Sequence, residues 1–349
     1  MTSQTVTSQT KTSASSLPLS MKTVEMREPG GADVLTLGTR DLPECRDQDV
    51  LIKVHYAGVN GPDLVQRRGH YPPPKGASDL LGLEVSGEVV GVGAGVTRWP
   101  IGTPVIALTN GGGYAEYVAV DADHVLPLPE DLSMADAAGL PETFFTVWSN
   151  AFFRHTITQG DVFLVHGGSG GIGATAIQIG TALGMTVITT ADGAEACQFC
   201  RDLGAKVAVD FRTEDFVPIT RDAGGASIIL DIIGGDYIAR NIKAAKHDAR
   251  LISLAFNKGS KIDIDLMPMM LKRLTLTGST LRSRPDEFKA AVARDLEEKL
   301  WPLFDPKSAH PLRPTTDKIF PMAEAAAAHQ FMESGQQRGK ILLEISPAS

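Results

Sequence analysis

Gly168, Gly170 and Gly173 follow an apolar run at 162–166, and their spacing is the clearest indication of chemistry in this chain. The pattern is G-x-G-x-x-G: the first glycine permits a tight turn, the second lets the backbone approach a pyrophosphate, and the third lets a helix pack closely on the strand. The unpaired N–H groups at the start of that helix favour a bound phosphate. The turn therefore predicts a dinucleotide site formed by Gly168, Ser169, Gly170, Gly171, Ile172 and Gly173.

The segments around this turn alternate between strand and helix patterns. Strand 162–166 precedes helix 172–183 and strand 186–191, after which Asp192 stands where a carboxylate could hold a ribose diol. Further patterns follow at 194–203, 207–209, 227–232, 250–255 and 274–278. This alternation predicts a Rossmann-type, doubly wound parallel sheet covered on both faces. An α/β core with a simple glycine turn is the alternative.

Length and charge narrow the class of protein. A chain of 349 residues favours two domains, and a net charge of −8 without clusters of Lys and Arg argues against nucleic acid or an acidic membrane as the main partner. A small molecule is the expected partner. No apolar run is long enough to span a bilayer, which predicts a soluble protein.

The three cysteines form no disulfide framework, and we expect a reducing, cytoplasmic location. Cys197 and Cys200 have CxxC spacing, but they lie in a predicted helix without a second ligand pair, which favours a helical coincidence over a zinc or redox motif. Residues 1–20 are rich in Ser and Thr, and we expect a disordered tail rather than a targeting segment.

The rest of the chain divides around the dinucleotide region. Residues 21–148 contain short alternating strands, such as 50–56 and 84–91, separated by Gly and Pro turns, which is typical of a β-barrel. The dinucleotide domain takes 149–285. Residues 286–349 hold helical patterns at 287–300 and 323–332 and a last strand at 340–345. That strand needs a sheet to join, so we expect the segment 286–349 to complete the β-rich domain.

This order of segments resembles the zinc-free quinone oxidoreductases of the medium-chain dehydrogenase/reductase superfamily. The likeness covers nearly the whole chain from Met21, through AGVNGPDLVQRRG at 57–69, YPPP at 71–74, LGLEVSG at 81–87, GGGYAEY at 111–117, LPET at 140–143, the glycine turn, and Gly339-Lys340. Within the family it looks closest to the p53-inducible branch. The resemblance implies a Rossmann domain inserted in a GroES-like catalytic domain.

The resemblance also implies that no metal is bound. Where the superfamily's zinc enzymes have their first ligand this chain has Asn60, and Leu83 replaces the histidine before Glu84. Without a Lewis acid to stabilise an alkoxide, reversible alcohol oxidation loses its usual mechanism. Hydride delivery to a strongly electrophilic quinone or activated enone stays feasible.

Several site residues are carried over from the family. Asn60 resembles the asparagine beside the nicotinamide and substrate, Thr146 the threonine bound to the nicotinamide ribose or amide, and Tyr71 the tyrosine lining the quinone pocket. Each has a structural alternative: Asn60 could cap a helix, Thr146 could be a buried helix threonine, and Tyr71 a turn aromatic. Asn257 and Arg282 follow late strands of the dinucleotide domain and are further candidates, although Arg282 could be a surface charge or interface contact.

The cofactor is NADPH or NADH, and the sequence leaves the preference open. NADPH-using relatives have Gly-Ser after the second strand and then a lysine, where this chain has Asp192-Gly193 and Glu195-Ala196. A carboxylate that binds a free ribose diol repels a 2′-phosphate at the same place. This favours NADH, although Arg212 and Lys340 could supply compensating positive charge.

Three functions stay open at this point. The first is NAD(P)H-dependent quinone reduction, and the second is reduction of α,β-unsaturated ketones, aldehydes or thioesters, with Tyr71 or water as the proton donor. The third is a non-catalytic, crystallin-like role as a nucleotide-binding protein. The strand at 273–278 reads as the last of its sheet, and an exposed edge there predicts a two-fold homodimer.

Overall fold

The computed structural model describes residues 11–12 and 17–347, which form two compact units. The first contains residues 1–142, 285–294 and 316–349, and the second contains 143–284 and 295–315. The second unit is thus inserted in the first, as expected. The bounds differ from the expected ones in three places: the first boundary lies at 142/143, the second at 284/285, and residues 295–315 belong to the second unit.

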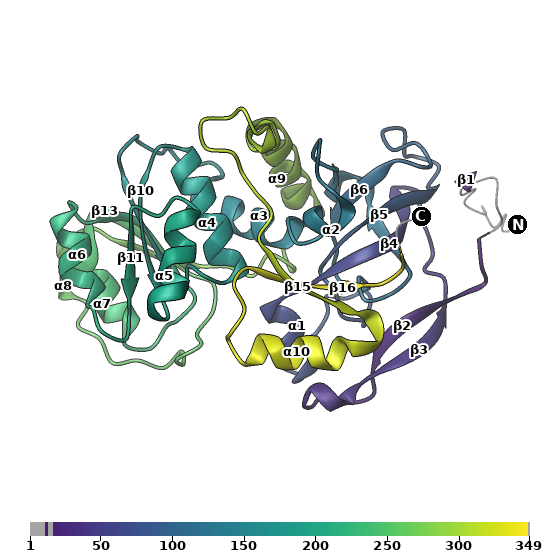
Figure 1. Cartoon of the computed structure of the whole chain (residues 1–349), viewed down its shortest axis with the longest axis horizontal. Helices are drawn as coiled ribbons and strands as arrows, with labels where there is room; N and C mark the ends of the chain where they lie inside the picture. The colour runs from purple at the N-terminus through teal and green to yellow at the C-terminus, as the bar shows by residue number, and fades with distance from the viewer. Residues whose placement is uncertain (1–10, 13–16, 348–349) are drawn as a thin grey trace, which may run out of the picture. The chain divides into compact units, whose positions relative to one another are not determined.

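Parallel strands form the second unit (Figure 1). Within the described residues, six strands form one sheet in the order β11-β10-β9-β12-β13-β14. Their bounds are β9 Val162–His166, β10 Thr186–Ala191, β11 Val207–Asp210, β12 Ala226–Asp231, β13 Ala245–Ser253 and β14 Thr275–Gly278. Every pair of neighbours is parallel. The doubly wound sheet predicted from the sequence is confirmed, and the predicted bounds of β9 and β10 agree with the structure.

Helices cover both faces of this sheet. Figure 1 shows α4 and α5 on one side and α6, α7 and α8 on the other. They span α4 Gly171–Ala182, α5 Gly193–Asp202, α6 Phe216–Asp222, α7 Tyr237–Ala244 and α8 Met267–Leu271. The five residues of β9 are all buried, as a central parallel strand requires. Cys197 and Cys200 lie on α5 and are buried, which agrees with the helical interpretation of their spacing.

Antiparallel strands dominate the first unit. In the described chain, eight strands form a sheet with the path β15-β16-β4-β5-β6-β8, with β1 paired to β5 and β7 to β4; β2 and β3 form a separate hairpin. Their bounds are β1 Lys11–Thr12, β2 Ser20–Met26, β3 Leu35–Asp41, β4 Asp49–Val59, β5 Glu84–Val92, β6 Pro104–Leu108, β7 Tyr117–Asp121, β8 Val125–Pro127, β15 Thr316–Pro321 and β16 Lys340–Glu344.

The last strand joins this sheet, as the sequence predicts. β16 pairs antiparallel with β4, placing Leu343 opposite Ala57, and parallel with β15. Helices α1 Gly61–Arg67, α2 Met134–Ala137 and α10 Ala325–Glu333 belong to the same unit, while α3 Pro141–Val147 and α9 Asp286–Lys299 contribute residues to both units. A core of Val, Ile and Leu side chains from β4, β5 and β16 holds the sheet together.

Part of the expected disordered tail lies outside the described residues, at 1–10 and 13–16. The described part is structured: residues 11–12 form β1, which pairs antiparallel with β5, and Ser20 begins β2. The Ser- and Thr-rich composition did not indicate these two pairings, because strand addition depends on a distant partner rather than on local composition. Among the described residues, no helix is both long and apolar enough to cross a membrane.

Candidate active site and nucleotide site

The glycine turn connects β9 to α4 at the carboxyl edge of the parallel sheet. Gly167 has a φ of +74°, so the left-handed residue of the tight turn is Gly167 rather than Gly168. Gly170 is the N-cap of α4. A glycine cannot cap with a side chain, so the first N–H groups of this 12-residue helix point toward whatever lies before it. The backbone thus offers the kind of donor set that binds a diphosphate.

The space around each glycine of the motif shows which one faces outward. A Cβ on Gly168 would lie 2.1 Å from Thr189 Oγ1, and one on Gly173 would lie 2.2 Å from the carbonyl oxygen of Gly167. A Cβ on Gly170 would have its nearest neighbour 3.7 Å away. Gly168 and Gly173 therefore serve the protein's own packing, whereas Gly170 borders open space. This arrangement fits a dinucleotide whose pyrophosphate approaches the chain at Gly170.

Asp192 follows β10 at the N-cap of α5, and it forms an ion pair with Arg212. The Arg212 Nη2 atom donates to Asp192 Oδ2 at 2.8 Å, and Nε contacts the other carboxylate oxygen. Both side chains are exposed, at 45% for Asp192 and 65% for Arg212. The carboxylate expected at the adenosine ribose is therefore already paired with a guanidinium, the compensating charge that the sequence left open.

Ala196, which occupies the position where NADPH-using relatives are expected to have a lysine, faces the protein interior. Ala196 is completely buried on α5, while Glu195 beside it is exposed. A lysine at 196 would have to bury its ammonium under the helix. In the first turn of α5, the residue that presents a charge to solvent is Glu195. The sequence alone did not determine which of these neighbouring positions faces solvent.

In the first unit, Asn60 and Lys340 meet in a buried cluster with Glu84. Lys340 Nζ lies 2.6 Å from Glu84 Oε1 and donates to Asn60 Oδ1 at 2.5 Å. Asn60 Nδ2 in turn donates to Glu84 Oε1 at 2.8 Å. The Glu84 side chain is fully buried and that of Lys340 is 6% exposed. The three groups satisfy one another's hydrogen bonds, as a buried charge pair requires.

Two glycines make room for this cluster. A Cβ on Gly58 would lie 1.9 Å from Glu84 Oε1, and one on Gly139 would lie 2.9 Å from Lys340 Cγ. The second oxygen of Glu84 accepts from the backbone N–H of Glu142 at 2.8 Å. Sequence reasoning named Asn60 and Lys340 but missed Glu84 as their shared partner, although Glu84 directly follows the position where the zinc enzymes have a histidine.

Asn60 is also the N-cap of α1, so its structural alternative is present as well. Its backbone N–H donates to Asp63 Oδ2 at 2.9 Å, and the other oxygen of Asp63 accepts from the N–H of Gly82 at 2.9 Å. Asp63 thereby fixes the backbone that carries Asn60. The side-chain amide of Asn60 contacts Lys340 and Glu84.

Behind Asp63 lies a second buried network, which sequence reasoning missed. His329 of α10 contacts the Tyr114 hydroxyl through Nε2 at 3.1 Å and Arg67 through Nδ1 at 3.3 Å. Burial and the nearby Arg67 guanidinium lower the pKa of His329 to about 3, so the ring is neutral at pH 7. Burial and the Asp63 carboxylate raise the pKa of Tyr114 well above its usual value. The network braces α1 against α10.

The remaining candidate residues lie in separate places. Tyr71 is half-buried in the loop after α1, and Thr146 is buried on α3 in the second unit. Asn257 is exposed after β13, where its N–H donates to the carbonyl of Ile232 at 3.3 Å. Arg282 is 6% exposed, so the interpretation as a surface charge is wrong.

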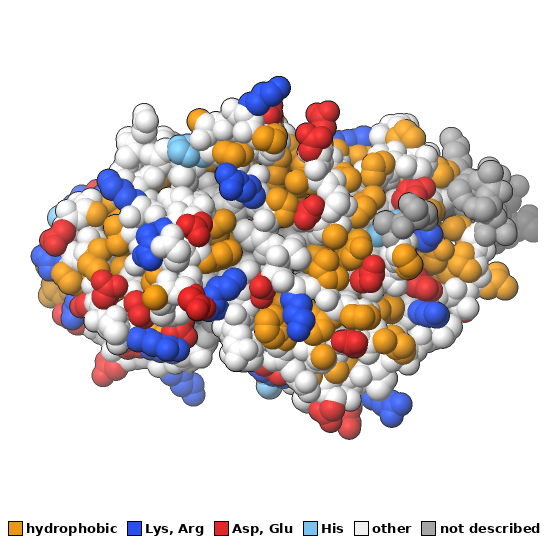
Figure 2. Space-filling model, viewed as in Figure 1, with side chains coloured by type: hydrophobic (Ala, Val, Ile, Leu, Met, Phe, Trp, Pro, Cys, Tyr) orange, Lys and Arg blue, Asp and Glu red, His pale blue; other side chains and the backbone are white. Residues whose placement is uncertain are grey.

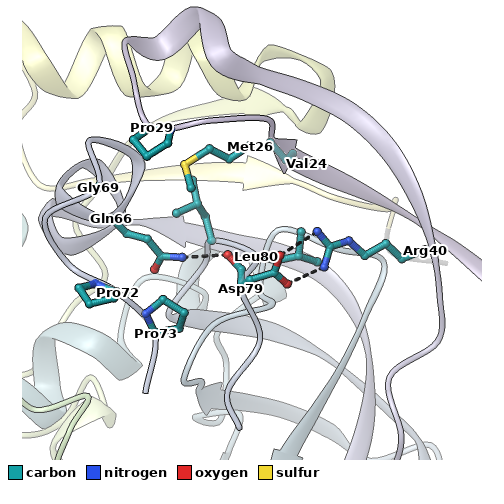
Figure 3. A pocket seen from close by; sticks show the side chains of 11 residues that line it. Val24, Met26, Pro29, Arg40, Gln66, Gly69, Pro72, Pro73, Asp79 and Leu80 are labelled. Atoms are coloured by element: carbon teal, nitrogen blue, oxygen red, sulfur yellow. Dashed lines mark hydrogen bonds and ion pairs between the residues drawn. The ribbon is translucent and has the colours of Figure 1, made fainter. Parts of the chain in front are cut away.

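A cavity of about 190 Å³ lies in the first unit beside the β2–β3 hairpin (Figure 3). Arg40 bonds to Asp79 on one side of it, and Gln66 donates to the Asp79 carbonyl. Its wall is otherwise mostly apolar, formed by residues that include Met26 and three prolines, Pro29, Pro72 and Pro73. Tyr71 is not among the lining residues. Across the described chain, no group of three or more His, Cys, Asp or Glu side chains is placed to hold a metal ion.

Comparison with known proteins places this architecture in a class. A family model for the alcohol dehydrogenase GroES-like domain matches residues 46–130, and one described as zinc-binding dehydrogenase matches 171–297. Together with the two units described above, these matches define a medium-chain dehydrogenase/reductase.

Full-length relatives narrow the class. Human quinone oxidoreductase is 30% identical over 335 residues, which cover 93% of this chain and 97% of that protein. Among solved structures, mycobacterial Rv1454c complexed with NADPH is 27% identical with a TM-score of 0.79, covering 93% of this chain and 99% of that one. An NAD-dependent alcohol dehydrogenase is also 27% identical, with a TM-score of 0.80 and coverage of 93% and 100%. The chain belongs to the quinone oxidoreductase family, and it is an oxidoreductase of this superfamily.

Proposed function

We propose that this protein is an NAD(P)H-dependent quinone reductase that works by direct hydride transfer without a catalytic zinc ion. Membership of the quinone oxidoreductase family supports the reaction class. The open approach at Gly170 and the ribose-side carboxylate of Asp192 support a dinucleotide cofactor.

The single observation that carries the zinc-free mechanism is the ammonium of Lys340 beside Asn60. The position that resembles the first zinc ligand holds an amide whose oxygen is already bound to this cation. Glu84, the one carboxylate in the cluster, is paired with the same ammonium at 2.6 Å. A metal ion at this position would meet the positive charge of Lys340, and the Glu84 carboxylate is already engaged by that charge, while Leu83 replaces the histidine.

Without a Lewis acid, the acceptor itself must disperse the charge that develops on hydride transfer. A quinone does so through conjugation, whereas a simple ketone does not. The bound nicotinamide supplies the hydride. The quinone gains this hydride and one proton, and the product is the hydroquinone together with the oxidised cofactor.

The residues of the chain have distinct roles in this proposal. Asn60, held by Lys340 and Glu84, orients groups at the reacting centre, and Thr146 binds the nicotinamide ribose or amide. Tyr71 lines the acceptor pocket. Gly168 to Gly173 with Asp192 and Arg212 hold the adenosine diphosphate half, and Asn257 and Arg282 are further contacts. Asn60 is best supported by the structure, because its side chain is locked by two buried partners.

Reduction of α,β-unsaturated ketones, aldehydes or thioesters is the second catalytic candidate. It needs the same hydride and also a proton at the α-carbon, for which Tyr71 or water would be the donor. A non-catalytic, nucleotide-binding role is the third candidate. All three candidates bind the nucleotide cofactor. They differ in the acceptor that is reduced, which is a quinone in the first, an enone in the second and none in the third.

The paired state of Asp192 bears on the choice between NADH and NADPH. With Arg212 engaged, the carboxylate repels a 2′-phosphate less than an isolated one would, and the guanidinium could itself contact that phosphate. The geometry therefore supports use of both cofactors, with the ratio set by these two side chains.

Small molecules are the partners that the surface supports best. The face shown in Figure 2 carries acidic and basic side chains interspersed, rather than the single-sign field that nucleic acid binding uses. We further propose a cytoplasmic homodimer. At the sheet edge, β14 is exposed along its length, and apolar side chains are exposed on it and on neighbouring α8, among them Leu276, Met270 and Leu271.

An acceptor screen tests the proposed function. The purified protein would be assayed with a panel of quinones and a panel of enones, each with NADH and with NADPH. We expect kcat/KM for at least one quinone to exceed that of every enone. The reverse order would favour the enone reductase, and saturable cofactor binding without turnover of either panel would favour the non-catalytic role.

A further inference from the structure

Four buried polar side chains form a chain of hydrogen bonds under the carboxyl edge of the parallel sheet. They are Thr190 on β10, His166 on β9, Asn241 on α7 and Asp231 at the end of β12. Each is at most 1% exposed. The roles assigned above use none of them, and buried polar groups of this kind need a reason to be retained.

The direction of each hydrogen bond in this chain can be assigned. Asn241 Nδ2 donates to Asp231 Oδ2 at 2.9 Å, so Asn241 Oδ1 must accept from His166 Nε2, at 2.7 Å. Burial lowers the pKa of His166 to about 4, so the neutral ring carries its one proton on Nε2. His166 Nδ1 then accepts from the Thr190 hydroxyl at 3.0 Å.

Each end of the chain holds backbone N–H groups of a loop. At one end, the N–H groups of Gly167 and Gly168 donate to the Thr190 carbonyl oxygen at 3.1 and 2.9 Å, and the Gly167 N–H also contacts the Thr190 hydroxyl oxygen, 3.4 Å from its nitrogen. At the other end, Asp231 Oδ1 accepts from the N–H groups of Ile233 at 2.6 Å and Gly234 at 3.1 Å. This chain of hydrogen bonds therefore connects the glycine loop after β9 with the turn after β12.

The two loops also touch directly. A Cβ on Gly167 would lie 2.7 Å from Ile232 Cδ1, so Ile232 packs against the left-handed glycine of the turn. The strands that carry these loops, β9 and β12, are neighbours at the point where the strand order reverses. Ligands of doubly wound sheets bind at the carboxyl ends of the strands at such a point.

We propose that Thr190, His166 and Asn241 are positioning residues that hold the loops 167–170 and 231–235 in one arrangement, so that a dinucleotide meets both as a single preformed surface. This inference deepens the proposed function and rests on its cofactor assignment. Preorganisation of two loops raises affinity because neither has to be ordered on binding. A substitution at one end of this chain of hydrogen bonds should therefore make the loop at the other end less ordered.

The sharpest test is Thr190→Val, which keeps the branched shape and removes the hydroxyl. Thr190→Ser restores a hydroxyl at the same position. Thr220→Val is the matched control, because the Thr220 hydroxyl is buried in the same unit and has no hydrogen-bond partner among the described residues. We expect the Kd for the tighter-binding nucleotide, measured by its fluorescence, to rise at least fivefold in Thr190→Val. The other two variants should stay within twofold of wild type.

Hydrogen exchange in nucleotide-free protein tests the coupling itself. In Thr190→Val we expect faster exchange in the distant turn 231–235, and in Asn241→Ala faster exchange in the loop 167–170. If Asn241→Ala does not fold, the Thr190→Val measurement decides alone. A folded Thr190→Val with wild-type Kd, or with wild-type exchange at 231–235, would overturn the proposal. If wild type bound neither nucleotide, the cofactor assignment would fail, while the exchange result would still decide on coupling.

Discussion

Substitution of Gly170 by valine should separate cofactor binding from folding. Gly170 has a φ of −83°, which any residue can adopt, and a Cβ there would have its nearest protein atom 3.7 Å away. The branched side chain would project into the space where we place the pyrophosphate. We therefore expect the Kd for NAD(P)H to rise at least tenfold, about 1.4 kcal/mol. The stability cost should be about 1 kcal/mol or less, the usual penalty for a poorer N-cap.

Gly173→Ala is the matched contrast within the same motif. Its Cβ would lie 2.2 Å from the carbonyl oxygen of Gly167 and 2.5 Å from the Cα of Gly168, and both are backbone atoms. The loop would have to shift, at a cost of about 1–3 kcal/mol. This variant should lose thermal stability as well as affinity, whereas Gly170→Val should lose mainly affinity.

The assay combines isothermal titration with both nucleotides and a thermal melt of each variant. The expected pattern is a high Kd with a near-native melting temperature for Gly170→Val, and a lowered melting temperature for Gly173→Ala. A folded Gly170→Val protein that binds NAD(P)H like wild type would refute the reasoning, because the pyrophosphate would then lie elsewhere.

Three further predictions concern cofactor choice, acid stability and assembly. Asp192→Ser with Glu195→Lys should raise the NADPH-to-NADH ratio of kcat/KM at least tenfold, since it removes two negative charges and adds a positive partner for the phosphate, with the loss of Asp192 and the gain of the lysine each contributing about 1–3 kcal/mol; an unchanged ratio would count against a ribose site at Asp192. His329 and His166 have folded pKa values of about 3 and about 4, below the 6.5 of an unfolded histidine, so the unfolded state takes up protons first as the pH falls. The free energy of unfolding should be highest above pH 6.5 and should decline toward pH 4 by about 1.4 kcal/mol per pH unit for each histidine. A melting temperature that stays constant from pH 7 to 5 would contradict this. Leu271→Asp, on the apolar face beside β14, should convert a dimer into monomers in light scattering, and a wild-type monomer at micromolar concentration would remove the dimer proposal.

The elements of the second unit could be predicted because their signals are local. β9 is a short, mostly apolar run between Asp161 and Gly167, and β10 is rich in Val, Ile and Thr and ends before Asp192. The glycine motif then predicts a strand, a turn and a helix in that order. β13 was harder to predict from the sequence, because it begins at Ala245 and its first half carries exposed polar residues. The apolar pattern therefore indicated only the end of this strand.

Partnerships across long sequence separations could not be predicted. Lys340 and Asn60 are 280 residues apart, and only the folded sheet, in which β16 lies against β4, brings them together. The same holds for His166 and Asn241, whose contact depends on how α7 packs. Ala196 shows a third limit: a one-residue difference in helical phase decides whether a side chain faces the core or solvent.

Quinone-dependent oxidation of NAD(P)H in the presence of a strong chelator tests the central claim most directly. The purified protein would be dialysed against the chelator, its zinc content measured, and its steady-state rate compared with that of the untreated protein. The account predicts less than stoichiometric zinc and an unchanged rate with a quinone acceptor. One zinc ion per chain, lost together with the activity and restored on adding zinc back, would contradict it.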